Sequence, residues 1–492
     1  MSTRLAVLAI LVLLLNPAFA ALTTRLGLDV EQLTATAPGF HASITCLLPP
    51  SAPASYSCSG YARSLTTVLE SFSTALNLKS LSLAAPIAID AHYIPFCEET
   101  VDALDGDPAR DDASHARACA SALSHAGALA FAAAQRFWKV RETSNGMLSL
   151  APIPLVKFWA GAGAMHRASN VADLDLGAPG TDILMQVRSD WDGWYFGTES
   201  TPIKPHQMDM RITMTHELLH ALGVSFTGLD LDTAPGLALP WNYGGSSSGY
   251  WTNWTDATPW YMRHLVATNA THTGSSTPIP LPDLAARVTA WQPKSGTVKL
   301  ANVGETLARD SPDAAAAARA LHAAMTTPRA LAFQTTTSNL VYMDTTAPNA
   351  TANSATHLDS DTYGGAADDA ILVLDTARYT GRVWNATLGP ALASVLVSLG
   401  YTSVGSPPGS PVAGDALTAA AGGWEAVSGA PITMPSERID VMGWRWNWVR
   451  AAPWPWVNGA LWAVLGAAWV WLAKLDFKNV GRVREWHEMG RV

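Results

Sequence analysis

The chain of 492 residues is long enough for two or three domains and a large hydrophobic core. Its net charge of -9 and the lack of a basic run argue against a nucleic-acid partner. Charged residues make up only 14% of the chain, which is low for a cytosolic enzyme.

The N-terminus has the three parts of a secretory signal peptide over residues 1–20. Arg4 supplies a positive charge, residues 5–15 are apolar, and an Ala-x-Ala pattern ends at Ala20. We expect cleavage after Ala20. An N-terminal membrane anchor is the alternative, and it is disfavoured because the apolar stretch is short for a spanning helix.

The cysteine pattern fits an oxidising compartment. An even number of cysteines in a secreted chain predicts two disulfides, with three possible pairings. A zinc site built from the same residues is the alternative, and the lack of a C-x-x-C spacing disfavours it. The cysteines are Cys46, Cys58, Cys97 and Cys119.

Four Asn-x-Ser/Thr sequons cluster in the second half of the chain, which favours a glycoprotein with exposed loops there. The sequons begin at Asn253, Asn269, Asn349 and Asn385.

Apolar periodicity predicts an α+β body in which a helix packs on a twisted sheet. Strands are expected over 81–93, as one or two elements, and over 182–188. The stretches 227–304 and 406–429 are expected to be loop-like. Helices are expected over 61–77, 113–138, 312–324 and 390–399, the last closed by Gly400.

Residues 215–223 read THELLHALG and contain the pattern H-E-x-x-H, on a helix predicted to begin near Met208. His216 and His220 lie four residues apart, so they project from one face of the helix. Both imidazoles can then bind one Zn²⁺, with Glu217 placed to take a proton from a water molecule. Gly223 is expected to end this helix in a left-handed conformation. An ordinary amphipathic helix with two histidines is the alternative.

A catalytic zinc needs three protein ligands and an open position, so a third residue is required. His322 lies in an apolar helix and is better explained as structural, whereas His264 and His272 flank a sequon as loop residues do. The downstream candidates are His264, His272, His322, His357 and His487.

The run HELLHALGVSF resembles the zinc helix of leishmanolysin, a surface metallopeptidase of metzincin type whose third histidine follows an insertion. Residues 180–187 resemble the family's preceding strand, and 392–401 its following helix. Residues 340–343 and 354–358 resemble its third-ligand segment. The similarity is patchy but ordered over 137–401, and it implies that His357 is the third ligand.

The chain departs from that family in two respects. The family has a methionine turn beneath the zinc, whereas 368–388 contains no methionine and offers Val373 as the nearest apolar residue. The family is also rich in disulfides, and its pro-segment carries a cysteine that caps the zinc. Cys46 is the candidate for that role here, although a structural disulfide explains it better.

Residues 454–473 are uncharged, and tryptophans lie near both ends, which predicts a transmembrane helix. The mildly positive tail, 474–492, suits the cytoplasmic side. A buried Trp-rich helix is the alternative. A glycolipid anchor is disfavoured because such signals do not end in a charged tail.

These features predict an N-terminal catalytic subdomain over 21–223 and a second subdomain over 224–445 that contains the insertion. The resemblance implies a metzincin-like zinc endopeptidase of protein or peptide substrates at the cell surface or on a secretory-pathway membrane. One Zn²⁺ per chain would be held by His216, His220 and His357, with Glu217 as general base. The alternatives are a weak or inactive peptidase-like adhesion protein and a secreted binding module without metal.

Overall fold

In a computed structural model, the chain divides into two compact units, one made of residues 1–96 and 127–434 and the other of 97–126 and 435–492. The described residues all lie in the first unit. They are 29–48, 56–81, 83, 85–94, 129–142, 148–161, 180–189, 191–197, 202–224, 229–231, 234–240, 250–251, 258–268, 277–291, 298–299, 302–345, 354–364, 369–373, 379–385, 388–401, 424–426 and 432–433.

Several predictions therefore lie outside the described residues: the signal peptide, the segment 454–473, the tail, and the sequons at Asn253, Asn269 and Asn349. Within the described part, no helix combines the length and apolar character that crossing a membrane requires. Asn385 is described and exposed, as expected for an accessible sequon.

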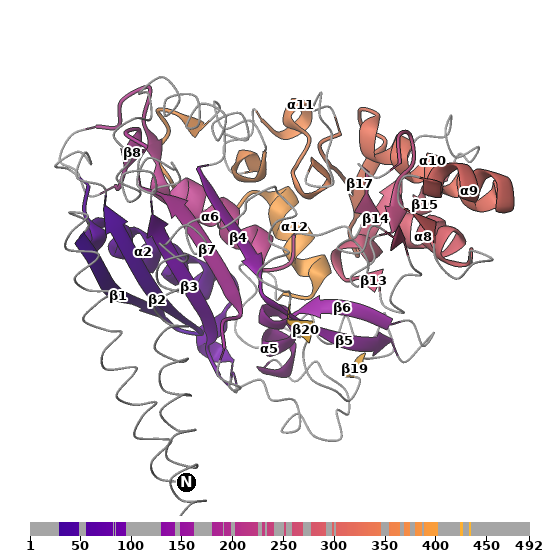
Figure 1. Cartoon of the computed structure of the whole chain (residues 1–492). Helices are drawn as coiled ribbons and strands as arrows, with labels where there is room; N and C mark the ends of the chain where they lie inside the picture. Colours follow the sequence, from indigo (N-terminus) through magenta and orange to yellow (C-terminus); the bar gives the residue numbers. More distant parts are fainter. Residues whose placement is uncertain are drawn as a thin grey trace, which may run out of the picture. The chain divides into compact units, whose positions relative to one another are not determined.

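A five-stranded sheet, in the order β1-β2-β3-β7-β4, supports the rest of the unit (Figure 1). β2, β3 and β7 run parallel, whereas β1 and β4 are antiparallel to their neighbours. The helices α2 and α6 contact each other and pack on this sheet. The elements are β1 (Asp29–Ala37), β2 (Phe40–Leu48), α2 (Cys58–Ala75), β3 (Ile87–Ile94), β4 (Ala130–Ala134), β7 (Ile183–Arg188) and α6 (Met210–Ala221).

The other described elements form smaller sheets and helices. The strands are β5 (Arg136–Glu142), β6 (Leu148–Pro152), β8 (Trp194–Tyr195), β9 (Met208–Asp209), β10 (Leu229–Asp230), β11 (Leu239–Pro240), β12 (Tyr250–Trp251), β13 (Thr258–Pro259), β14 (Leu265–Ala267), β15 (Ile279–Pro280), β16 (Val298–Lys299), β17 (Leu331–Gln334), β18 (Leu340–Tyr342), β19 (Trp424–Ala426) and β20 (Ile432–Thr433). The helices are α5 (Ile153–Gly161), α8 (Leu281–Thr289), α9 (Val303–Asp310), α10 (Pro312–Thr326), α11 (Ser360–Tyr363), α12 (Pro390–Leu399) and the 3₁₀ turns η1 (Leu78–Ser80), η4 (Tyr261–His264), η6 (Ser354–Thr356) and η7 (Asp369–Leu372).

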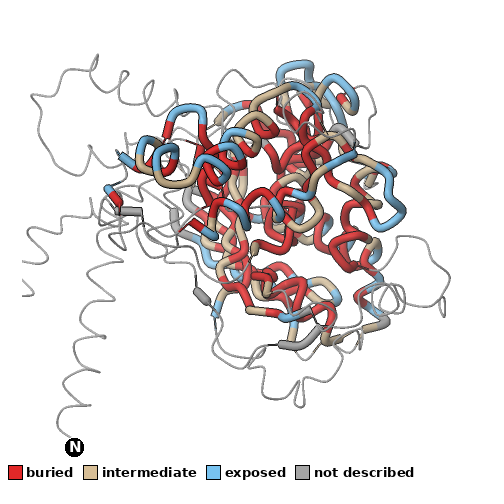
Figure 2. The backbone as a smooth tube through the Cα atoms, turned by 90° about the vertical axis from the view of Figure 1, so that its right-hand side faces the viewer, coloured by how far each residue is buried: buried red, intermediate tan, exposed pale blue. Residues whose placement is uncertain are grey.

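One continuous core of buried residues links these elements, from Ala35 in β1 to Tyr401 after α12. Figure 2 marks the buried parts of the backbone in red. The mixed α+β class is therefore confirmed. The prediction of a helix over 61–77 is confirmed by α2, and those over 312–324 and 390–399 by α10 and α12. Gly400 closes α12 with φ +110°, and the strand over 182–188 is β7.

The predicted helix over 113–138 is wrong at its C-terminal end. Ala130–Ala134 and Arg136–Glu142 are strands, and successive residues of β4 are alternately buried and half-buried. Alanine favours helices only weakly compared with the pairing and burial that β7 offers this segment. Residues 113–128 lie outside the described residues.

The loop-like prediction for 227–304 is wrong at α8, and the short strands β10 to β16 and the turn η4 also lie in this region. Leu281, Leu284 and Val288 are spaced for one helical face and are buried, and a proline stands in the first turn. The rest of the region is rich in Gly, Pro and Thr, which hides this short pattern.

One disulfide joins Cys46 in β2 to Cys58 at the start of α2. It bears out one of the two bonds expected, whereas Cys97 and Cys119 lie outside the described residues. Because Cys46 is bonded to Cys58, it does not serve as a zinc-capping ligand in this structure.

A buried charge cluster fastens β7 to its surroundings. The Asp182 carboxylate, fully buried, accepts hydrogen bonds from Arg136, from Lys157 Nζ at 2.6 Å and from the Ala88 amide at 2.8 Å. Arg136 opens β5 and Lys157 lies in α5, so three elements meet at one carboxylate.

We expect Asp182→Ala to cost about 3–5 kcal/mol of unfolding free energy, because it leaves two buried cations without their counter-charge. Urea denaturation at neutral pH measures the loss. Arg309→Ala is the control, since the Arg309 side chain is 73% exposed and its ion pair with Asp310 should contribute little. Equal stability losses in the two variants would contradict this account of Asp182.

Candidate metal centre

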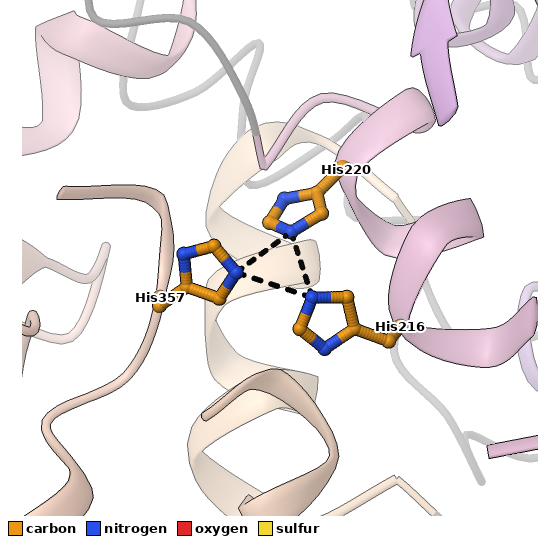
Figure 3. Close-up of side chains that lie close together, drawn as sticks. All are labelled: His216, His220 and His357. Carbon is orange, nitrogen blue, oxygen red and sulfur yellow. Dashed lines mark hydrogen bonds between the residues drawn. The ribbon is translucent and has the colours of Figure 1, made fainter. Parts of the chain in front are cut away.

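Three histidines from two distant segments converge on one point (Figure 3). His216 and His220 project from α6 one turn apart, and His357 follows η6. The Nε2 atom of His216 lies 3.1 Å from that of His220 and 3.1 Å from that of His357, and the third side of the triangle is 3.2 Å. The structure therefore brings together the three residues predicted as ligands.

Backbone carbonyls fix the tautomers of the two helical histidines. His216 Nδ1 lies 2.7 Å from Ile371 O, and His220 Nδ1 lies 2.7 Å from Val224 O. A carbonyl oxygen only accepts, so both Nδ1 atoms carry the hydrogen and donate it. In a neutral ring this leaves Nε2 as a bare lone pair.

Two lone pairs at 3.1 Å cannot share a hydrogen bond, so the His216–His220 contact is repulsive unless something positive lies between them. A bound cation relieves this repulsion by accepting all three lone pairs. Nitrogens held at 2.0–2.1 Å from a tetrahedral Zn²⁺ stand about 3.3–3.4 Å apart, close to the observed triangle. The donor set and its size therefore fit a transition-metal ion bound by imidazoles.

The protonation of the histidines also suits metal binding. Burial lowers the pKa of His216 to about 3 and that of His220 to about 4. The Nδ1 hydrogen bonds to Ile371 and Val224 oppose this shift only in part. Both rings are neutral at physiological pH, which is the form that binds a metal.

Glu217 lies on α6 between the two histidines and is buried. Its Oε2 accepts a hydrogen bond of 2.8 Å from the Ala132 amide of β4. Burial raises the pKa of Glu217 to about 8, and the Ala132 hydrogen bond opposes this shift. A cation held beside it would favour the ionised carboxylate.

The segment 371–373 supports the cluster from beneath with three consecutive carbonyls. Ile371 O accepts from His216, Leu372 O accepts from the Leu358 amide next to His357, and Val373 O accepts from the Tyr379 hydroxyl. The Val373 side chain is fully buried. Without a methionine, this segment holds His216 and the residue after His357 by backbone hydrogen bonds, and its own apolar side chains are buried.

The start of α6 is hydrogen-bonded to the segment 380–384, which follows 371–373 in the chain. Asp209 caps the helix by accepting from the Arg211 amide at 3.0 Å, and its Oδ2 accepts from the Trp384 amide at 3.0 Å. Met208 also bridges to Thr380. These bonds fix the helix with the histidines relative to the residues around Tyr379.

The end of α6 follows the sequence prediction. Gly223 has φ +128°, in the left-handed region that favours glycine, and the helix stops at Ala221. The turn after α6 places the Val224 carbonyl within hydrogen-bonding distance of His220 Nδ1. Tyr401 Oη donates to Leu222 O at 2.7 Å and so holds the turn against the end of α12.

Of the other histidine candidates, the two that the structure describes, His264 and His322, are not part of the cluster. His264 is not a loop residue, because it lies in η4 and its ring stacks on Phe333 at 4.9 Å between centroids. His322 lies on α10, as expected of a structural residue. His272 and His487 lie outside the described residues.

Two groups at this site could not have been predicted from residue types. The Ala132 amide and the Ile371 carbonyl are backbone groups, so the identity of their side chains carries no information about them. Two tertiary contacts would have indicated these backbone groups: the pairing of β4 with β7, and the approach of Ile371 to His216 on α6.

The raised pKa of Glu217 predicts a pH dependence of stability for the metal-free protein. The folded carboxyl keeps its proton up to about pH 8, whereas the unfolded one loses it near pH 4.5. This contribution to stability is complete below pH 4.5 and is lost as the pH rises toward 8, by about 1.4 kcal/mol per pH unit.

Urea denaturation with a chelator, between about pH 5.5 and 7.5, measures this slope. Glu217→Gln should remove it, because the amide does not titrate. The histidines titrate in both proteins, so the difference between the two curves isolates Glu217. Parallel curves for wild type and variant would contradict the assignment.

A family model described as SPBPB7E8-like matches residues 29–232 of the chain. This stretch contains the five-stranded sheet, α2 and the H-E-x-x-H helix but not His357. No curated protein and no solved structure matches the chain.

Proposed function

We propose that this protein is a zinc-dependent endopeptidase of the leishmanolysin-like, metzincin type. The observation that carries the proposal is the triangle of Nε2 atoms, with a buried glutamate beside it. A purely structural histidine cluster would use its ring nitrogens to hydrogen-bond one another. Here the Nδ1 hydrogens of His216 and His220 are directed to carbonyls, and the lone pairs face one another.

His216, His220 and His357 would hold the ion, and three imidazoles are a donor set that suits zinc. When bound, Zn²⁺ lowers the pKa of a water molecule and polarises the carbonyl of the scissile peptide bond. The Nδ1 hydrogen bonds orient two of the ligand rings, as outer partners of metal ligands do in other metalloproteins.

Glu217 is placed for general acid–base catalysis. Its carboxylate takes a proton from the water as the water oxygen attacks the carbonyl carbon. It then passes this proton to the amine as the C–N bond breaks, so the carboxylate is regenerated. A cation held by the histidines would favour the ionised carboxylate, which is the form that accepts the proton.

The chain's location belongs to the same proposal. The predicted signal peptide, a disulfide between Cys46 and Cys58, and an exposed sequon at Asn385 support an extracellular body. The uncharged segment 454–473 would anchor it as a single-pass protein with a cytoplasmic tail. Proteins or peptides outside the cell are then its substrates.

Metal analysis of the purified full-length protein, together with cleavage of casein and of a peptide library, tests the proposal. We expect one zinc per chain, and cleavage that a chelator abolishes and added zinc restores. Zinc without any cleavage would favour the inactive, adhesion-type alternative. A protein that binds no zinc would overturn the proposal in favour of a metal-free binding module.

A further inference from the structure

β4 ends the order of the five-stranded sheet, so one of its edges faces away from β7. The amide of Gln135 donates to Asp182 O at 2.8 Å, and the amide of Arg188 donates to Leu129 O at 2.9 Å. In an antiparallel pair, backbone groups point alternately toward and away from the partner strand. Residues 130, 132 and 134 therefore direct their N–H and C=O groups to the open edge.

On this edge, the Ala132 amide is hydrogen-bonded to the Glu217 carboxyl group. Its N–H donates to Glu217 Oε2 at 2.8 Å, which is a short hydrogen bond to an acidic group. Within the described part of the chain, no other donor is hydrogen-bonded to this carboxyl group. The side chain of Ala132 is only a methyl group, so the contact depends on the backbone alone.

We propose that the Ala132 N–H is the positioning group for Glu217, holding Oε2 so that Oε1 is directed to the water it deprotonates. The inference rests on the proposed function. A buried carboxylate with no donor would be strongly destabilised, and its rotation about χ3 would be free. The hydrogen bond from Ala132 to Oε2 stabilises the buried carboxylate and stops its rotation, so the direction in which Oε1 points is fixed.

The geometry predicts an effect on the chemical step rather than on metal binding. The rings of His216 and His220 are held by their own carbonyl partners, Ile371 O and Val224 O, and neither bond involves Ala132. Loss of the Ala132 bond therefore leaves the ligand triangle in place. Without the bond to Ala132, the Glu217 carboxyl group can shift, and a small shift is sufficient to move its oxygen away from the proton that it must accept.

Hydrogen exchange of single amides in the full-length protein tests the contact without disturbing β4. We expect the Ala132 amide to be protected in the wild type and in Glu217→Gln, whose amide oxygen still accepts. In Glu217→Ala it should exchange at least about ten-fold faster, with Ala130 unchanged as the internal control. Equal protection of Ala132 in all three proteins would overturn the inference.

Kinetics of a proline pair test the consequence. Ala132→Pro removes the donor on an open edge, where proline is tolerated, and Ala130→Pro makes the same change one outward position away. We expect Ala132→Pro to lower kcat about 100-fold with KM and zinc content unchanged, and Ala130→Pro to lower it far less. Equal losses, or a change confined to KM, would overturn the positioning role.

The two experiments separate this inference from the proposed function. If the wild type cleaves no peptide, the proposed function fails, and the exchange rates still decide whether Glu217 holds the Ala132 amide. If the wild type is active and the exchange rates do not respond to Glu217→Ala, the inference alone fails.

Discussion

Replacing Glu217 with glutamine should lower kcat for peptide cleavage by about 100- to 10,000-fold, while the protein still binds one zinc per chain. Glutamine has the same shape and still accepts from the Ala132 amide through its oxygen. It cannot take a proton from water at neutral pH. The change therefore removes the proton transfer and leaves the histidine cluster and the fold intact.

Cleavage of a fluorogenic peptide, with zinc content measured on the same samples, checks this result. Glu305→Gln is a matched control, because Glu305 is exposed on α9 and touches no part of the site. Activity of Glu217→Gln within a factor of about two of wild type would remove Glu217 from the mechanism.

Replacing His357 with alanine should weaken zinc binding by more than about 100-fold and abolish cleavage. Removing even an outer partner of a metal ligand costs up to this much, and His357 supplies one of the three nitrogens directly. The variant should keep its fold, because its neighbours Leu358 and Asp359 remain bonded to Leu372 O and Tyr342 O.

Thermal unfolding with and without zinc reports this loss independently of activity. At a zinc concentration of 1,000 times the dissociation constant, binding stabilises the folded protein by about 4 kcal/mol. We expect this gain in the wild type and in His322→Ala, a variant on α10 away from the cluster, and its absence in His357→Ala. Stoichiometric zinc and normal casein cleavage by His357→Ala would refute its assignment as a ligand.

The site was predictable from the sequence to the extent that side chains define it. The spacing of His216 and His220 places both on one helical face whatever the fold, so this part follows from helix geometry alone. His357 stands 137 residues after His220, and only the resemblance to leishmanolysin singled it out from the other histidines. No local sequence pattern indicates which distant segment of the chain will contact a given helix in the folded protein.

The elements were predictable where one physical effect dominated. The apolar stripe of α2 and the largely apolar sequence of β7 leave little choice of structure. β4 shows the opposite case, because its alanines suit a helix and only the partner strand decides otherwise. In place of the methionine, the sequence indicated only the side chain of Val373, whereas the structure shows that the backbone carbonyls of 371–373 make the supporting hydrogen bonds.

The distance along the chain between the ligands also determines how long the growing chain lacks its third ligand during synthesis. His220 is made 137 residues before His357, and Leu222 is clamped by Tyr401 only after 179 residues have been added. At 5–20 residues per second, the first interval lasts roughly 7–27 seconds. Throughout that time the growing chain carries the two-histidine helix without its third ligand. Under the proposed function, the polypeptide would therefore enter the secretory pathway as an inert half-site and gain its third ligand only when residue 357 of 492 has been added.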